Sequence, residues 1–209
     1  MEDSKSFKDL QEIKNLMERS SRFLSLSGLS GVSAGIVAIL GAFALYWMLD
    51  FGQLKYDEHL HVLGSSTRRN VAGMLLLVAS LTFVFALVCA MYFSFRKAKK
   101  NQLRFWDHTT KRLLVHLFIP LIAGGFFTLI LIFRSDITLV ASAMLTFYGL
   151  ALVNAGKYTF GEIHYLGILE IILGLLAGIF TAFGLVFWTI GFGILHIVYG
   201  LIMYFRYER

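Results

Sequence analysis

The sequence predicts an all-α polytopic membrane protein, with six transmembrane helices arranged as three antiparallel hairpins and an amphipathic helix at the N-terminus. Hydrophobic residues make up 57% of the 209 residues and charged residues only 15%. An average soluble domain has about 45–50% apolar residues, glycine included, and about 25% charged residues. The apolar residues also gather into six long runs. Because a soluble fold of this size cannot bury them, the composition excludes a soluble enzyme, a disordered chain and a nucleic-acid-binding domain.

Each of the six runs is long enough to cross a hydrocarbon core about 30 Å thick as a helix. The expected spans cover residues 24–49, 71–95, 113–133, 137–153, 163–182 and 185–204. The first run is too long for the apolar region of a cleavable signal peptide, and a charged segment precedes it. We therefore expect residues 23–209 to form one transmembrane bundle.

Residues 1–22 are charged but periodic. Phe7, Leu10, Ile13 and Leu16 recur at helical spacing among Lys, Glu, Asp and Gln, which predicts a cytoplasmic amphipathic helix. Two placements remain open for this helix. It lies either on the inner leaflet of the membrane or on the cytoplasmic loops of the protein itself.

The distribution of positive charge predicts the orientation. Of the 19 Lys and Arg residues, fifteen lie before the first span, in the loops after the second and fourth spans, and at the C-terminus. Such an excess marks the cytoplasmic side, so both termini are expected to be cytoplasmic in a cell inner (plasma) membrane. The basic loop 96–112 is expected to contact anionic lipid headgroups. The net charge of +6 is thereby explained without nucleic acid as a partner.

Short connections follow the third span, at residues 134–136, and the fifth, near residues 183–184. They make the flanking helices antiparallel neighbours, so residues at equal depth can be paired. Between spans five and six, this pairing places Glu170 opposite His196 within a tight glycine seam. Between spans three and four, it places His116 opposite Asn154. The residues expected to pack helices closely are Gly167, Gly174, Gly178, Gly193 and Gly200. The first span has its own ladder of small residues, Gly28, Gly31, Gly35 and Gly41. The tripeptide Tyr-Gly-Leu occurs at both 148–150 and 199–201, a weak repeat.

Glu170 is the one acidic residue expected deep in the lipid, where an ionised carboxylate is costly and needs a partner. Two interpretations remain open. The pair formed by Glu170 and His196 is either a proton or cation site, or a hydrogen-bonded pair that sets the register of two helices. With His116 and Asn154, it makes up the candidate intramembrane polar site.

Other chemistry finds little support in the sequence. The outer segment Asp57-Glu58-His59-x-His61 does not match the spacing of a closed zinc site, and a solvated loop is favoured. The histidines differ too much in depth for a pair of haem ligands. No catalytic triad, phosphate-binding loop or zinc-protease motif occurs. We therefore expect no catalytic residue, no metal and no cofactor, and hence no enzyme. The single cysteine, Cys89, excludes an intramolecular disulfide.

The run from Met17 to Gly31, MERSSRFLSLSGLSG, and the glycine-rich segment Gly191-Phe-Gly-Ile-Leu-His196 resemble an uncharacterised family of small six-span inner-membrane proteins of Bacteroidota-type bacteria. The resemblance implies a bacterial inner membrane and no activity. Two functions follow from the residues themselves. The first is a non-enzymatic sensor or accessory protein that acts through helix packing and a basic cytoplasmic face, with a protein partner or as a homo-oligomer. The alternative is a small-solute or proton-coupled transporter that uses Glu170 and His196.

Overall fold

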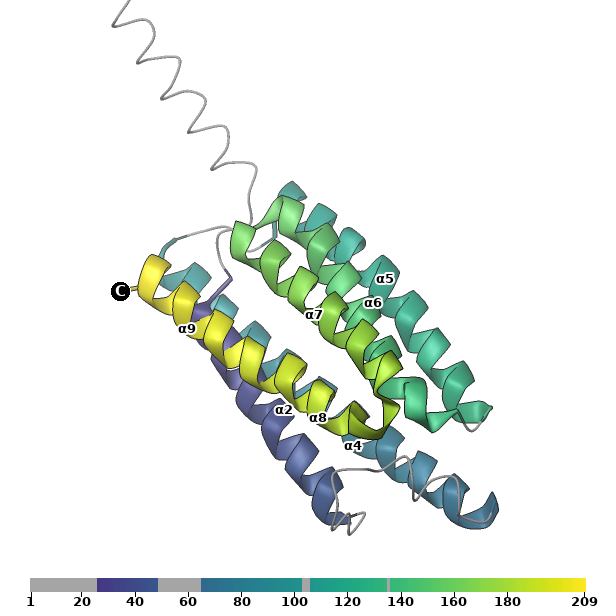
Figure 1. Ribbon diagram of the computed structural model, residues 1–209. Coiled ribbons are helices and arrows are strands. Elements are labelled where there is room, and N and C mark those ends of the chain that lie inside the picture. The colour runs from purple at the N-terminus through teal and green to yellow at the C-terminus, as the bar shows by residue number, and fades with distance from the viewer. Residues whose placement is uncertain (1–25, 49–64, 103–105, 135) are drawn as a thin grey trace, which may run out of the picture.

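The computed structural model describes residues 26–48, 65–102, 106–134 and 136–209. Within these ranges the chain is helical and has no strand, and six helices are long and apolar enough to cross a membrane (Figure 1). The predicted fold class, an all-α polytopic membrane protein with six spans, is confirmed. The expected amphipathic helix 1–22 and the outer segment 57–61 lie outside the described residues.

Five of the spans are largely single α-helices. They are α2 (Gly28–Met48), α4 (Ser65–Lys100), α5 (His108–Phe133), α6 (Val140–Ala155) and α7 (Gly161–Ile179). Short 3₁₀ turns flank α6, η1 (Ile137–Leu139) before it and η2 (Gly156–Tyr158) after it. The sixth span is composite. After the 3₁₀ turn η3 (Thr181–Phe183), it consists of α8 (Gly184–Trp188), the π-helix η4 (Thr189–Leu195) and α9 (His196–Tyr207).

The six spans form two units of three helices each. In the first unit, α2 lies between α4 and the sixth span. In the second unit, α6 lies between α5 and α7. Figure 1 shows α5, α6 and α7 grouped on one side of the bundle and α2, α8 and α9 on the other. The contacts within each unit are far more extensive than those between them, so the interface between the units is the natural place for a change of packing.

The predicted glycine seam between spans five and six is wrong. Gly167 and Gly174 of α7 face α6, where a Cβ at Gly167 would come within 2.7 Å of the Gly149 carbonyl oxygen. Gly193 and Gly200 of the sixth span face α2 instead. A Cβ at Gly200 would lie 2.6 Å from the Gly28 carbonyl oxygen. The tight turn after α7 joins the two helices, but each packs its row of small residues into a different unit.

The two Tyr-Gly-Leu tripeptides occupy comparable positions in the two units. Gly149 of α6 meets Gly167 of α7, and Gly200 of α9 meets Gly28 of α2. The tyrosine before each glycine, Tyr148 or Tyr199, packs against one apolar cluster, formed by Leu152, Ile163 and Leu166. Both units thus use a glycine for close helix packing and direct the preceding tyrosine toward their common interface.

The segment 96–112, predicted as a basic loop, is mostly helical. Helix α4 continues to Lys100, and α5 begins at His108. Asp107 caps the start of α5, since its carboxylate accepts hydrogen bonds from the backbone N–H and the hydroxyl of Thr110, each at 2.7 Å. Such a cap satisfies donors that the first helical turn leaves free. Hydropathy marks the edge of the membrane, whereas capping marks the end of the helix, and the two differ here by several residues.

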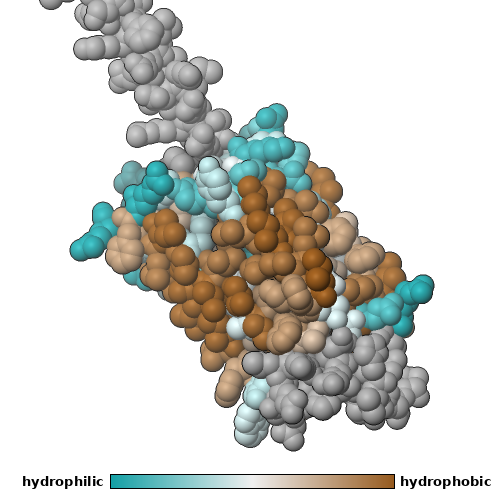
Figure 2. Space-filling view, in the orientation of Figure 1, coloured by the Kyte–Doolittle hydropathy of each residue, from teal (hydrophilic) through white to brown (hydrophobic). Residues whose placement is uncertain are grey.

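The exterior of the bundle is apolar over its middle, as the space-filling view shows (Figure 2). Large side chains such as Phe133, Trp47 and Ile179 are 83%, 77% and 72% exposed. A surface of this kind is unfavourable in water and suits the hydrocarbon of a bilayer. Polar side chains are concentrated at the ends of the bundle, so those inside it stand out.

Candidate functional site

The candidate site lies at the interface between the two units, around Glu170 of α7. This side chain is 0% exposed, and neither carboxyl oxygen has a hydrogen-bond partner within the described part of the chain. Its Oε1 lies 3.5 Å from Nδ1 of His196, the first residue of α9. The structure therefore brings together Glu170 and His196, although their helices belong to different units.

His196 is held by two hydrogen bonds. Its Nδ1–H donates to the carbonyl oxygen of Gly191 at 3.0 Å, and its Nε2 accepts from the hydroxyl of Tyr148 at 2.8 Å. Because a carbonyl oxygen can only accept, the proton of the neutral ring is assigned to Nδ1. Both ring nitrogens are thus occupied by neutral partners, and the Glu170 carboxyl lies beside the Nδ1–H without its own hydrogen bond.

The π-helix η4 shapes one wall of this site. Thr189 donates its hydroxyl proton to the carbonyl oxygen of Leu185 at 2.7 Å at the point where the helix widens. Gly191 then lies directly against Glu170, because a Cβ there would come within 2.5 Å of Oε2. Stretches of π-helix are rare and are often found at functional sites. Here the widened backbone positions the Gly191 carbonyl for His196 and leaves room for the carboxyl.

A file of polar side chains connects this site to one end of the bundle. Glu162 and Glu170 share one face of α7, and His196, Tyr199 and Tyr207 share one face of α9, by their helical spacing. Glu162 accepts hydrogen bonds from Arg206 at 2.7 Å and from Tyr207 at 2.8 Å.

Tyr199 lies between the two ends of the file. Its hydroxyl is buried without a hydrogen-bond partner among the described residues. From Glu162 to Glu170 the file extends about 12 Å along the helix axis.

The second predicted pair, His116 and Asn154, does not form. His116 stacks on Tyr158 with ring centroids 4.9 Å apart, and Nε2 lies 2.9 Å from the Tyr158 hydroxyl. Tyr158 is in the turn η2, just beyond α6, so it reaches back over the start of α5. Asn154 is half-buried on α6 and has no recorded contact with His116. The site around Glu170 therefore does not include these two residues.

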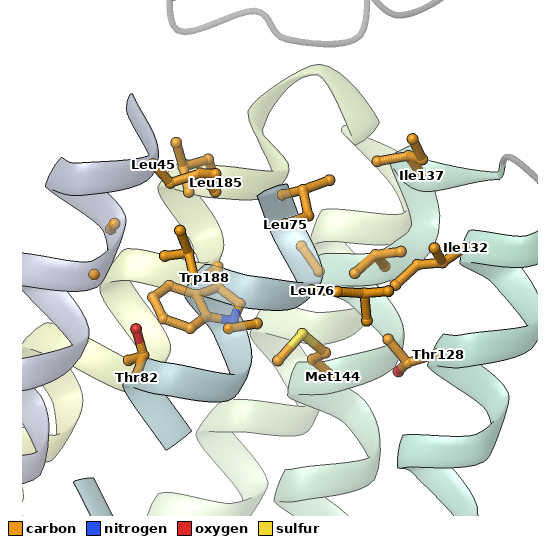
Figure 3. Close-up of a pocket in the computed structure, with 16 residues that line it drawn as sticks. Leu45, Leu75, Leu76, Thr82, Thr128, Ile132, Ile137, Met144, Leu185 and Trp188 are labelled. Carbon is orange, nitrogen blue, oxygen red and sulfur yellow. The ribbon is translucent and has the colours of Figure 1, made fainter. Parts of the chain in front are cut away.

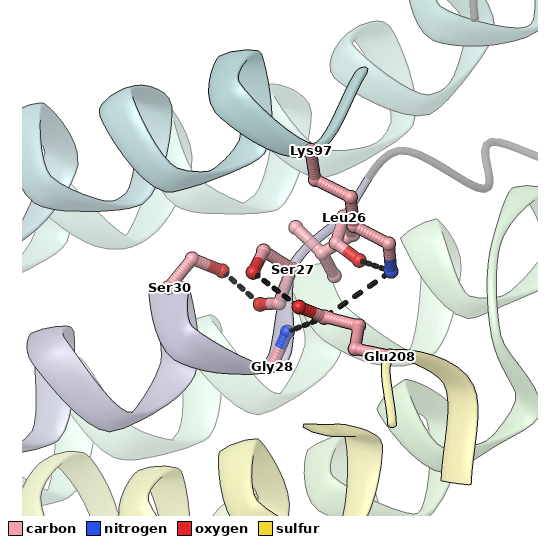
Figure 4. A network of polar contacts seen from close by, with 6 residues as sticks. All are labelled: Leu26, Ser27, Gly28, Ser30, Lys97 and Glu208. Atoms are coloured by element: carbon pink, nitrogen blue, oxygen red, sulfur yellow. Dashed lines mark hydrogen bonds and ion pairs between the residues drawn. The ribbon is translucent and has the colours of Figure 1, made fainter. Parts of the chain in front are cut away.

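A second polar cluster joins the ends of three helices in the first unit (Figure 4). Glu208 accepts hydrogen bonds from the Ser27 hydroxyl at 3.1 Å and from the backbone N–H of Gly28, the first residue of α2. The ammonium group of Lys97, near the end of α4, lies 2.7 Å from the Leu26 carbonyl oxygen and 3.2 Å from Glu208. Lys97 and Glu208 are only 8% and 12% exposed. Lys97 therefore stabilises the bundle and is not available to lipid headgroups.

Sequence reasoning missed Tyr148, Tyr158 and the ion pair between Lys97 and Glu208. A tyrosine inside an apolar run has no motif around it, and its role depends on which helix it faces. One signal for the ion pair was present. Lys97 and Glu208 both lie at the same predicted edge of the membrane, where opposite charges tend to pair. No group of three or more metal-binding side chains occurs in the described ranges.

Comparisons of the chain with protein-family models, with curated proteins and with solved structures return no match.

Proposed function

We propose that the chain is a non-enzymatic sensor or regulatory membrane protein in which the protonation of Glu170 controls the packing between the two three-helix units. One observation carries the proposal. A fully buried carboxyl group without a hydrogen bond lies at the interface between the units, 3.5 Å from a histidine that is held by neutral partners.

Ionisation of a buried carboxyl group costs free energy. A neutral carboxyl group is tolerated in this apolar setting, whereas an ionised one without a partner is strongly unfavourable. Ionisation of Glu170 therefore demands a response from its surroundings. Neutral His196 turns its Nδ1–H from Gly191 toward the Glu170 carboxylate, or the interface opens to water. Either response alters contacts that connect α7 to the sixth span, and so changes the relation between the units.

Few titratable side chains surround Glu170 among the described residues, so its own protonation state is the one that changes the charge at the interface. The titratable side chains around it are Tyr148 from α6 and His196 from α9. The segment 184–195, which forms α8 and η4, contains no titratable residue. Among the described residues, no Lys or Arg pairs with the carboxyl group, and Nδ1 of His196 lies 3.5 Å from it.

Charge distribution supports the remaining parts of the proposal. The excess of Lys and Arg at one end of the bundle favours an inner membrane with both termini in the cytoplasm. The last turn of α4 and the first turns of α5 expose Lys99, Lys100, Lys111 and Arg112. These four residues are suited to anionic lipid headgroups or to an acidic surface of a cytoplasmic partner.

One observation favours the alternative, a proton-coupled transporter. The polar file from Glu162 through Tyr199 and Tyr148 to His196 lies between the two units, as expected for a path along which protons reach Glu170. A solute also needs a cavity that reaches the site. Glu170 and His196 are 0% and 7% exposed, and neither lines the cavity found in the described part of the chain. This closed packing supports the sensor over the transporter.

The test measures the distance between the units as pH changes. Spin labels at Trp47→Cys and Arg134→Cys, with Cys89→Ser, report on α2 and α5 at their exposed ends. In nanodiscs the distance distribution should shift as pH rises, because ionisation of Glu170 is what the packing resists. Glu170→Gln, which is permanently neutral, should abolish the shift. The matched control Asp136→Asn removes an exposed carboxylate and should retain it. A shift that persists in Glu170→Gln contradicts the proposal.

Two further measurements separate the functions. Proteoliposomes that show pH-driven solute flux, lost in Glu170→Gln, would establish the transporter instead. Co-purification of a specific cytoplasmic partner that survives high salt supports the regulatory role, and its loss on removal of residues 1–22 would locate the contact. Flux without any change in distance between the labels would overturn the sensor mechanism.

A further inference from the structure

A cavity of about 130 Å³ lies between the two units (Figure 3), near the last turn of α2 and the last turn of α5. Every span except α7 contributes to its wall. Leu45 comes from α2, Leu76 from α4, Ile132 from α5, Met144 from α6 and Trp188 from α8. It is separate from the site around Glu170, whose residues do not line it.

The chemistry of the wall is apolar, with few polar groups. The polar lining residues are Thr82, Thr128 and Trp188. The Thr128 hydroxyl is buried without a hydrogen-bond partner in the described ranges. Figure 3 shows the indole nitrogen of Trp188 on the side of the ring that faces the other lining side chains. Its N–H makes no hydrogen bond within the described part of the chain. The cavity thus combines an apolar volume with a free hydrogen-bond donor.

The size and polarity of the cavity limit what it takes up. An apolar cavity of about 150 Å³ in a protein interior stays dry and binds small apolar molecules, so this one, of nearly the same volume, is unsuited to water. From Ile137 to Met144 it extends about 10 Å along the helix axis. An elongated apolar group fits this shape better than a compact one.

The position of the cavity indicates where its occupant comes from. Helix α4 packs mainly against α2, and α5 packs mainly against α6. The two helices therefore flank the cavity, and Leu76 of α4 packs against the cluster that includes Leu131 and Ile132 of α5. Next to it, α4 exposes Leu77 and Leu81, at 56% and 50%, to the hydrocarbon of the bilayer. Acyl chains are the apolar groups that surround these helices. The ester carbonyls of lipids lie at the membrane interface, where tryptophan N–H groups are commonly found.

We propose that this cavity binds a segment of one acyl chain of a bilayer lipid, with Trp188 Nε1–H donating a hydrogen bond to the ester carbonyl of that chain. The bound chain contacts both units and fills the space between them. Neither Glu170 nor His196 lines the cavity, so it is a separate ligand site of the protein.

The test uses Trp188 as the reporter in the full-length chain. Trp47→Phe and Trp106→Phe leave Trp188 as the single tryptophan. Vesicles contain phosphatidylglycerol, a rising fraction of which carries bromine at carbons 6 and 7 of its acyl chains. Bromine quenches a tryptophan in contact with it. We expect a saturable component of quenching at low fractions of brominated lipid, in addition to the gradual quenching by lipids around the bundle. Replacing Trp188 itself by Phe should reduce the lipid retained after mild delipidation, as measured by native mass spectrometry.

Cavity-filling variants decide whether the lipid acyl chain lies inside the cavity. Ala141→Leu places three more carbon atoms in the cavity and should remove the saturable component. Ala123→Leu makes the same change at an exposed position of α5 that does not line the cavity and should leave it intact. If Ala141→Leu fails to fold, Ala79→Leu fills the cavity from α4. The proposal is overturned if both filled variants keep the saturable component, or if extraction of the purified protein recovers a lipophilic molecule other than a lipid.

Discussion

The ion pair between Lys97 and Glu208 is expected to account for a large part of the stability of the first unit. The perturbation is a double-mutant cycle with Lys97→Met, Glu208→Gln and the two together. Methionine retains most of the apolar length of lysine, and glutamine retains the shape of glutamate. The changes therefore remove charge while preserving volume, and the cycle isolates the interaction between the two side chains.

The magnitude follows from the burial and distance of the pair. At 3.2 Å and an effective dielectric constant of about 20, the attraction is about 5 kcal/mol before the cost of desolvation is subtracted. Removing one partner of a buried pair costs about 3–5 kcal/mol, because the other charge stays behind. Glu208 retains its hydrogen bonds to Ser27 and Gly28 after Lys97→Met, which favours a cost at the lower end of this range. We expect a loss of about 3 kcal/mol for each single variant, and a coupling of about 2 kcal/mol.

The assay is reversible unfolding in mixed micelles. It gives the free energy of unfolding of the wild type, the two single variants and the double variant. The matched control is the pair Arg134 and Asp136, at 3.6 Å, whose side chains are 75% and 51% exposed. For the corresponding change Asp136→Asn, we expect a loss below about 1 kcal/mol, as for other exposed pairs. The reasoning is refuted if Lys97→Met also costs less than 1 kcal/mol, or if the two changes at Lys97 and Glu208 are additive.

Three further predictions concern helix packing and the buried acid. Gly200→Leu should lower the free energy of unfolding by at least about 2 kcal/mol through overpacking, because a Cβ there already meets the backbone of Gly28 and Val32 at 2.6 and 2.5 Å. Gly125→Ala, where a Cβ meets nothing within 4 Å, should be neutral or stabilising by up to about 1 kcal/mol, and a loss as large as that of Gly200→Leu would show that the glycine contacts do not determine the cost. The thermal stability of the wild-type protein should fall as pH rises, since the buried Glu170 is stable only while it is neutral. Glu170→Gln should flatten that part of the pH profile in scanning calorimetry, whereas an unchanged profile would assign it to other groups. His116→Phe should preserve the stacking on Tyr158 while losing one exposed hydrogen bond, at a cost below about 1 kcal/mol by chemical denaturation.

Part of the candidate site could be predicted from the sequence. The tight turn after α7 relates residues of spans five and six by depth, and this relation brought Glu170 and His196 together. The same reasoning paired His116 with Asn154, which is wrong because Tyr158, one turn beyond Asn154, reaches the ring first. Depth constrains which residues have a chance to meet. It does not determine which side of a helix faces which neighbour.

The hydrogen-bond partners of His196 show most clearly what the sequence does not predict. Gly191 is five residues away on the same span, and its carbonyl is accessible only because the backbone adopts a π-helix there. Tyr148 comes from α6, a helix that is not adjacent to the sixth span in the sequence. Neither a π-helical segment nor a contact between the two units produces a periodic pattern in the sequence from which it could be predicted.

The sequence alone determined that the chain crosses the membrane six times, because hydropathy is a local property that each segment carries by itself. The tertiary structure decided which glycine faces meet. Rows of small residues occur on α2, α6, α7 and the sixth span, and several pairings of these rows satisfy the same pattern. In lipid no hydrophobic force acts between helices, so the choice depends on close packing and polar contacts. These pair α7 with α6 and the sixth span with α2, and they leave Glu170 buried where the two units meet.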